Sequence, residues 1–229
     1  MKRNQSGFTL IEIAIVLVII GLLLGGVLKG QELINSAKVK NLAADFKNVP
    51  LYIYGYQDKY RALPGDDSLV TSHVAATATV ATSATGARGN GLIEGQWNSN
   101  TQTDESIVFW QHVRMAGFAA GGIVVPTAAI ANDQDPYLPQ NAVGGRIGIE
   151  SSSSAPPIAG LRGSYIVCSM HILGKFAKQL DTTMDDGVNT TGSIMVTLDK
   201  ASGSARTAGG EAAVAAPADD TLYTVCMGV

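Results

Sequence analysis

Residues 8–28 form a nearly continuous hydrophobic segment, in which 21 residues include a single charge, Glu12. At 1.5 Å of rise per residue, a helix of this length crosses the roughly 30 Å hydrocarbon core of a bilayer. A secretory signal peptide has a shorter apolar stretch, followed by small residues at a cleavage site. The pattern therefore predicts a membrane-spanning helix, preceded by the basic residues Lys2 and Arg3.

Beyond residue 28 the hydrophobic pattern changes from continuous to periodic. Apolar residues recur there at spacings of three and four: Val39, Leu42, Phe46, Val49 and Ile53. This spacing is typical of an amphipathic helix. Pro50 is expected to kink the helix, because the pattern continues past it, and Pro64-Gly65 is expected to stop it. We therefore expect one helix from the apolar segment to about Tyr60, with residues 29–62 as its amphipathic half.

The remaining residues, 63–229, predict one globular head of mixed structure. A helix is expected from Asp104, as its N-cap, to about Ala116. A short helix is expected around residues 172–180. Three apolar segments of strand length are expected to form strands: 164–170, 193–198 and 221–227. Three segments predict loops, the first with a potential edge strand: 70–86, 117–154 and 201–218. The expected fold class is α+β, with the long helix packed on a C-terminal antiparallel sheet.

Composition narrows the functional classes. The chain is 46% hydrophobic and 15% charged, with a formal net charge of −3. This balance supplies no basic surface of the kind that binds nucleic acid. The three histidines lack the spacing of a metalloprotease motif, and the serine-hydrolase elbow motif is absent from the sequence. We therefore expect neither an enzyme nor a nucleic-acid partner.

Glu12 distinguishes the apolar segment from an ordinary membrane anchor. A carboxylate within the bilayer costs roughly 2.5–3.5 kcal/mol on insertion scales, so it indicates a function. A plain anchor explains the length of the segment and the positive charges before it. It does not explain Glu12, or the glycine at position 7 directly before the segment.

The residues Ser6-Gly7-Phe8-Thr9-Leu10-Ile11-Glu12 resemble the processing motif of type IV prepilins and type II secretion pseudopilins. In that family a membrane peptidase cuts after the glycine, and the new terminal residue is N-methylated. The resemblance implies a leader peptide at residues 1–7, cleavage between Gly7 and Phe8, a methylated Phe8 and an assembly role for Glu12. Cleavage would create a cationic α-amine at Phe8, which can compensate the carboxylate of Glu12 on a neighbouring subunit.

The resemblance implies a structural subunit of a type IV pilus-like or pseudopilus filament. Such a subunit is inserted in the inner membrane with its head in the periplasm, and residues 8–28 polymerise it into a helical homopolymer outside the cell. Its partners are copies of itself, the prepilin peptidase and methyltransferase, and an inner-membrane assembly platform. Two alternatives remain open: a minor or tip subunit of the same system, and a single-pass anchored binding domain that does not polymerise.

Three interior segments resemble a group of bacterial prepilin-like proteins with less specificity: Leu63-Pro64-Gly65-Asp66-Asp67, Trp110-Gln111-His112 and Asp185-Asp186-Gly187. They support the same family without indicating a particular pilus system.

The two cysteines, Cys168 and Cys226, lie in two apolar segments that predict strands. A head outside the cytoplasm meets an oxidising environment, which favours a disulfide over two buried thiols. Pilins commonly carry a carboxy-terminal disulfide, so the resemblance implies the same pairing. The alternative use of Cys168 with His171 as half of a zinc site lacks a second half.

Three pairs of aspartates lie in predicted turns: Asp66 with Asp67, Asp185 with Asp186, and Asp219 with Asp220. Hard cations bind several oxygens from flexible loops, and some pseudopilins bind calcium in the carboxy-terminal loop region. Asp185 and Asp186 are therefore the candidate calcium ligands. The alternative is that these pairs only accept hydrogen bonds from their own turns.

Overall fold

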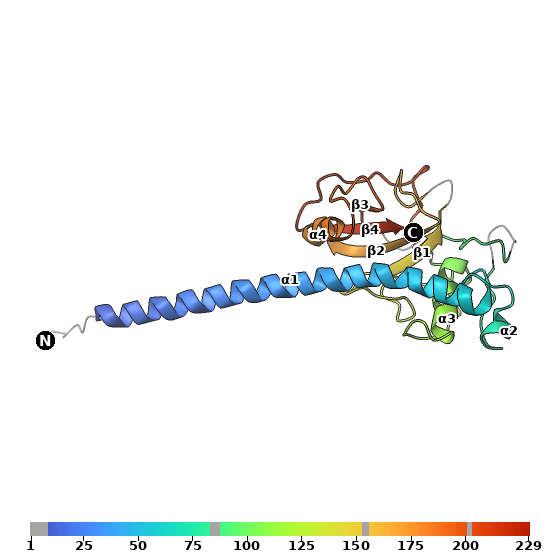
Figure 1. Cartoon of the computed structure of the whole chain (residues 1–229), viewed down its shortest axis with the longest axis horizontal. Helices are drawn as coiled ribbons and strands as arrows, with labels where there is room; N and C mark the ends of the chain where they lie inside the picture. The colour runs from blue at the N-terminus through green and yellow to red at the C-terminus, as the bar shows by residue number, and fades with distance from the viewer. Residues whose placement is uncertain (1–8, 83–87, 153–155, 201–202) are drawn as a thin grey trace. The chain divides into compact units, whose positions relative to one another are not determined.

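The computed structural model of the chain describes residues 9–82, 88–152, 156–200 and 203–229. The elements in chain order are α1 (Leu10–Tyr60), α2 (Val70–His73), α3 (Glu105–Met115), β1 (Ile147–Ser151), β2 (Tyr165–Leu173), α4 (Gly174–Met184), β3 (Ile194–Leu198) and β4 (Leu222–Gly228) (Figure 1). The chain divides into two compact units between Lys38 and Val39, and we describe each unit by itself.

Helix α1 confirms the long helix expected from the sequence. It is 51 residues long and continues through Pro50. The periodic apolar residues that follow position 38 are all buried: Val39, Leu42, Phe46, Val49 and Ile53. The helix ends at Tyr60, and Arg61 has a positive φ of 55° that no longer fits a right-handed helix.

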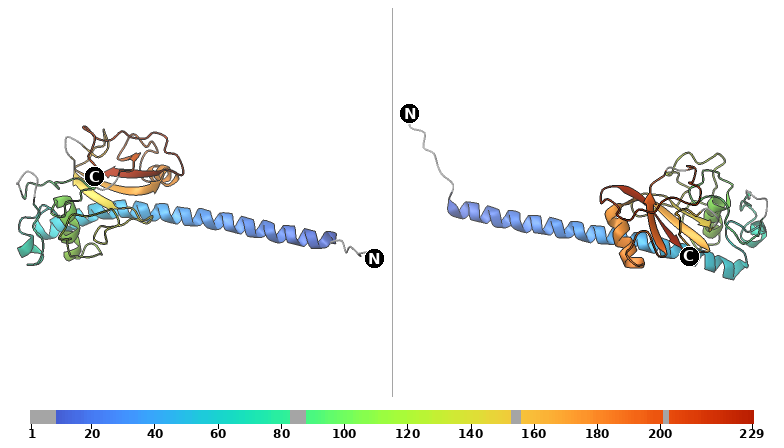
Figure 2. Two further views of the ribbon diagram at one scale, coloured as in Figure 1. Left: turned by 180° about the vertical axis from the view of Figure 1, so that it is seen from behind. Right: turned by 90° about the horizontal axis from the view of Figure 1, so that it is seen from above.

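The four strands form one antiparallel sheet in the order β1-β2-β4-β3 (Figure 2). The last strand of the chain, β4, lies in the middle, paired with β2 on one side and with β3 on the other. Helix α4 and β3 lie between β2 and β4 in the sequence. Residues far apart in the chain therefore meet in the centre of the sheet.

Alternation along the strands divides the core into two clusters on opposite faces of the sheet. One cluster joins Val167 of β2 and Val225 of β4 to the buried residues of α1 and to α3. The other cluster joins Cys168 of β2 and Cys226 of β4 to the ring of Trp97. The backbone of Trp97 lies so close to β1 that a Cβ at Gly148 would be 2.1 Å from its carbonyl oxygen, so only glycine fits there.

The structure corrects three local expectations. Residues 147–151, expected as loop, form strand β1, and all five are buried. The short helix α2 replaces the loop or edge strand expected at its position. Strand β2 runs to Leu173 before α4 begins at Gly174, so residues 172 and 173 are strand and not helix.

A bulge in β2 explains why the end of this strand was misjudged. The register with β4 shifts between Ser169 and Ile172, and His171 has a positive φ of 60°. The carboxylate of Asp199 accepts the backbone N–H of His171, which holds the bulge. Because a bulge adds one residue, Ile172 turns toward the α1 cluster and loses the alternation seen earlier in the strand.

Helix α3 begins where expected, but its cap differs. Asp104 is the N-cap residue, yet its side chain makes no capping hydrogen bond. The carboxylate of Asp104 instead accepts a 2.5 Å hydrogen bond from the hydroxyl of Ser99. The side chain therefore ties the preceding loop to the helix start.

Candidate functional site

Helix α1 begins with a reciprocal pair of side-chain contacts between Thr9 and Glu12. The backbone N–H and the hydroxyl of Thr9 donate to Oε2 of Glu12, at 3.0 and 2.8 Å. The backbone N–H of Glu12 approaches the Thr9 oxygen at 3.4 Å. With Thr9 at the N-cap and Glu12 three residues later, this is a capping box.

The capping box gives Glu12 a structural role that the interpretation of the sequence missed. The pattern Thr9-x-x-Glu12 directly before an apolar run is the sequence signature that could have revealed it. Both contacts from Thr9 reach the same carboxylate oxygen of Glu12, which leaves acceptor capacity on the side chain. Gly7 and Phe8 lie outside the described residues, so cleavage, methylation and the pairing of Glu12 with an amine stay predictions.

The apolar surface of the first part of α1, residues 10–28, is exposed within its own unit. The described residues 10–28 are all exposed, from Leu10 at 90% to Ile20 at 46% among the large apolar side chains. By length and composition α1 is able to cross a membrane, with a mean hydropathy of 2.8 over its most apolar 18 residues. An apolar surface of this extent in water is strongly unfavourable. Lipid or other protein must therefore cover it.

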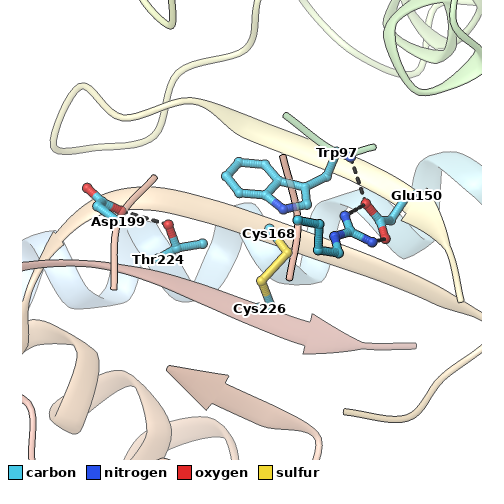
Figure 3. Close-up of a disulfide and its surroundings, with 7 residues drawn as sticks. Trp97, Glu150, Cys168, Asp199, Thr224 and Cys226 are labelled. Atoms are coloured by element: carbon cyan, nitrogen blue, oxygen red, sulfur yellow. Dashed lines mark hydrogen bonds and ion pairs between the residues drawn. A yellow bond between two sulfur atoms is a disulfide. The ribbon is translucent and has the colours of Figure 1, made fainter. Parts of the chain in front are cut away.

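The disulfide between Cys168 and Cys226 is confirmed. The two residues are direct partners in the register of β2 and β4, with their Cα atoms 4.1 Å apart. Both are fully buried, with the ring of Trp97 nearby (Figure 3). Since Cys168 is bonded to Cys226, it is not a free thiolate for the zinc site considered with His171.

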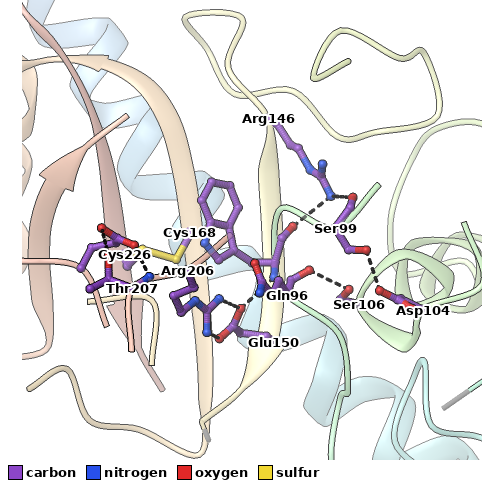
Figure 4. A network of polar contacts seen from close by, with 12 residues as sticks. Gln96, Ser99, Asp104, Ser106, Arg146, Glu150, Cys168, Arg206, Thr207 and Cys226 are labelled. Carbon is purple, nitrogen blue, oxygen red and sulfur yellow. Dashed lines mark hydrogen bonds and ion pairs between the residues drawn. A yellow bond between two sulfur atoms is a disulfide. The ribbon is translucent and has the colours of Figure 1, made fainter. Parts of the chain in front are cut away.

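The cluster around Trp97 also includes a buried ion pair, between Arg206 and Glu150. The guanidinium of Arg206 donates to both carboxylate oxygens of Glu150, which also accepts the backbone N–H of Trp97 at 2.7 Å. Burial raises the pKa of Glu150, and its hydrogen bonds with Arg206 offset part of that rise. The loop expected to face solvent at 201–218 thus contributes a buried contact in its described part (Figure 4).

Two of the interior motifs that resemble prepilin-like proteins meet in the fold. The backbone N–H of Gly65 donates to Nδ1 of His112 at 3.0 Å, and Nε2 of His112 is 2.9 Å from the carbonyl oxygen of Thr79. His112 is fully buried, and desolvation lowers its pKa. The imidazole is therefore the neutral tautomer with its proton on Nε2. These contacts make His112 a structural link between two loops.

The third motif forms a turn after α4. Oδ2 of Asp185 accepts the backbone N–H of Ile194 at 2.8 Å. Asp186 accepts the backbone N–H of Val188 and the hydroxyl of Thr191, both at 2.8 Å. These are the turn contacts offered as the alternative to metal binding, so by themselves they do not favour calcium. A third carboxylate, Asp181, joins the pair and was not singled out from the sequence.

The comparisons with known proteins identify the amino terminus of the chain. A family model, the prokaryotic N-terminal methylation motif, matches residues 2–28. Comparison with curated proteins and comparison with solved structures each gave no match. The matched residues include Gly7, Phe8 and the capping-box pair of Thr9 and Glu12. The chain therefore carries the N-terminal methylation motif that is the signature of type IV prepilins and pseudopilins.

Proposed function

We propose that the chain is a structural subunit of a type IV pilus-like or pseudopilus filament, processed after Gly7 and polymerised through α1. One observation carries the proposal: the methylation motif at residues 2–28 coincides with the exposed apolar part of α1. The apolar part of α1 needs lipid or protein around it, and it directly follows a motif for cleavage and methylation. Both features fit a subunit whose helix moves from the membrane into a filament.

The precursor is anchored in the inner membrane by this helix. Lys2 and Arg3 precede the apolar segment, and positive residues stay on the cytoplasmic side of a membrane helix. The head then lies in the periplasm, where disulfides form. The disulfide between Cys168 and Cys226 supports that placement.

Glu12 sets the axial register of the assembled helices. A carboxylate in lipid is costly, and pairing it with a cation removes much of that cost. Cleavage after Gly7 supplies the cation as the α-amine of Phe8. When the amine comes from a neighbouring subunit, one axial position satisfies Glu12 and other positions leave it unpaired.

The partners follow from this sequence of events. The prepilin peptidase and methyltransferase process the chain, an inner-membrane platform assembles it, and copies of the same chain form the filament. The family that carries this motif is structural and not enzymatic, which supports a structural subunit.

The composition of sheared filaments tests the proposal. The full chain is expressed in cells with the cognate assembly machinery, and the sheared extracellular fraction is quantified by mass spectrometry against the membrane fraction. We expect this chain to be the most abundant protein of the filaments. A small, fixed fraction of the filament mass would instead indicate a minor or tip subunit. Retention of all of the protein in the membrane, while filaments form without it, would refute the proposal.

A further inference from the structure

Asn90 and Gly91 form the only Asn-Gly pair of the sequence, and both lie exposed in the loop that precedes α3. An asparagine side chain is open to attack by the backbone nitrogen of the next residue, and glycine hinders this approach least because it has no Cβ. Gly91 has a positive φ of 82°, a conformation that glycine adopts readily. The loop therefore presents a chemically labile pair to solvent.

The side-chain carbonyl of Asn90 is held by the loop itself. Its oxygen, Oδ1, accepts the backbone N–H of Leu92 at 2.9 Å, in an Asx turn that folds the side chain back toward the peptide of Gly91. A nucleophile that adds to the carbonyl carbon places negative charge on this oxygen, and a donor at about 2.9 Å stabilises such charge. The N–H of Leu92 is therefore in position to act as an oxyanion donor.

The backbone nitrogen of Gly91 is in contact with a base. Its N–H donates to Oδ2 of Asp66 at 2.7 Å, within the roughly 2.6–3.2 Å reach of a general base. Asp66 is only 3% exposed, and its other oxygen accepts the N–H of Gly89, which fixes the carboxylate in place. A backbone amide is a poor nucleophile until a base removes its proton. Asp66 therefore supplies what the attack needs.

We propose that Asn90 is a site of self-catalysed deamidation, in which Asp66 is the general base. The nitrogen of Gly91 attacks the side-chain carbonyl carbon of Asn90 while its proton passes to Asp66. The intermediate collapses to a five-membered succinimide and expels the side-chain nitrogen, which takes the proton from Asp66 and leaves as ammonia. Water then opens either carbonyl of the ring, so position 90 becomes aspartate or isoaspartate.

The water for the last step has access to the site. Asp66, Gly89 and Gly91 line a surface pocket of about 480 Å³. The product adds one negative charge to the formal net charge of −3 and places it beside the carboxylate of Asp66. Isoaspartate also lengthens the backbone by one carbon, between the two N–H groups that Asp66 holds together. The modification therefore weakens the contacts that fix this loop.

Asn132 provides a comparison within the same chain. It is exposed, and its Oδ1 accepts the backbone N–H of Gln134 at 2.9 Å, in the same kind of Asx turn. The residue that follows it is Asp133, whose Cβ hinders attack by its backbone nitrogen. We therefore expect Asn132 to keep its amide under conditions in which Asn90 loses it.

The rate of deamidation in folded and unfolded protein tests the proposal. The full chain in detergent is incubated at neutral pH, with its head folded or unfolded by guanidinium chloride, and the tryptic peptide that begins at Gly89 is followed by mass spectrometry. We expect Asn90 to react at least tenfold faster in the folded chain, because a positioned base contributes roughly 10²–10⁴-fold. An equal or slower rate in the folded chain would mean that Asp66 only restrains the loop, and would overturn the proposal.

Three variants complete the test. Asp66→Asn removes the base and should lower the rate to that of the unfolded chain, whereas Asp220→Asn removes an exposed carboxylate from another loop and should leave it unchanged. Asn90→Gln should abolish the acidic product, because its longer side chain must close a six-membered ring, which forms more slowly. An undiminished rate in Asp66→Asn would also overturn the proposal. Where that variant folds poorly, the comparison of folded with unfolded wild type still decides the question.

Discussion

At the scale of single residues, Glu12 combines two roles that chemistry can separate. It caps α1 together with Thr9, and in the proposed filament it also pairs with the amine of a neighbouring subunit. The cap needs only a hydrogen-bond acceptor on the side chain, because its partners are a backbone N–H and a hydroxyl. The pair needs a negative charge.

Glu12→Gln keeps the acceptor and removes the charge, so it separates the two roles. We expect normal insertion in the membrane and a roughly tenfold or larger fall in filament yield, because each neighbour's amine then lacks its partner. The measurement is the ratio of filament to membrane protein, with the variant expressed alone and together with the wild type. The matched control is Thr9→Val, which removes the hydroxyl and keeps the charge, and which should polymerise nearly as well as the wild type. Normal filament yield from Glu12→Gln alone would show that the charge has no assembly role.

Glu105 offers a separate test of the head. It is fully buried, and burial, helped by the charges of nearby acidic groups, raises its pKa to about 7, although a hydrogen bond from the backbone N–H of Glu94 offsets part of the rise. The folded state thus favours the protonated form. The stability from that preference is complete below the unfolded pKa of about 4.5, and it is lost as pH rises to about 7.

Glu105→Gln should therefore stabilise the head at pH 8, by about 1–2 kcal/mol, and change little at pH 4.5. The measurement is the free energy of unfolding by urea at both values of pH, with wild type and variant side by side. A variant that is less stable than the wild type at pH 8 would contradict the cost that burial places on the ionised Glu105.

Residue chemistry was only partly predictable from the sequence. The cysteine pair was identified because only two cysteines exist. Asp181 was not recognised as a member of the acidic cluster, because its burial and its short distance to Asp185 are not visible in the residue type. The role of His112 was equally hidden, since Gly65 and Thr79 reach it from distant loops.

At the scale of secondary-structure elements, the disulfide joins the two central strands. The bridge closes a loop with a sequence separation of 58, which contains α4 and β3. In the chain-entropy model a loop of that size contributes about 4 kcal/mol. Both cysteines are also packed in one cluster with Trp97, and this packing stabilises the pairing of β2 with β4.

Replacing both cysteines by alanine should lower the free energy of unfolding by about 2–4 kcal/mol. Thermal unfolding of the full chain in detergent measures the loss, and non-reducing peptide mapping of the wild type should recover Cys168 linked to Cys226. The control has the same number of substitutions, at two exposed residues: Lys175→Ala with Lys178→Ala. An unchanged melting temperature in the double cysteine variant would contradict the stabilising role of the bridge.

Elements were predicted well where one periodicity is maintained. The apolar spacing of three and four after position 38 identified the buried face of α1, and β3 and β4 were found at nearly their observed ends. Strand β1 was missed because Gly148 interrupts its apolar pattern and Glu150 is buried by pairing with Arg206. The bulge at His171 hid the end of β2 for a similar reason, since tertiary contacts hold it.

At the scale of the whole molecule, the two units carry different kinds of information. The methylation motif matches residues 2–28, and the proposed processing of the chain rests on this short segment. The second unit, from Val39 to Val229, folds into a head whose sheet and disulfide are explained by strand pairing and packing. The amino-terminal motif could therefore be identified from the sequence, while the geometry of the head required the fold.

The mass of the amino terminus in protein purified from cells tests the central claim most directly. The account predicts a chain that begins at Phe8, lacks residues 1–7 and carries one additional methyl group on its terminal amine. Cells without the prepilin peptidase should yield the chain with its leader, as should the variant Gly7→Val in normal cells. A mature protein that keeps residues 1–7 in peptidase-positive cells, or a normal Phe8 terminus in Gly7→Val, would contradict the account.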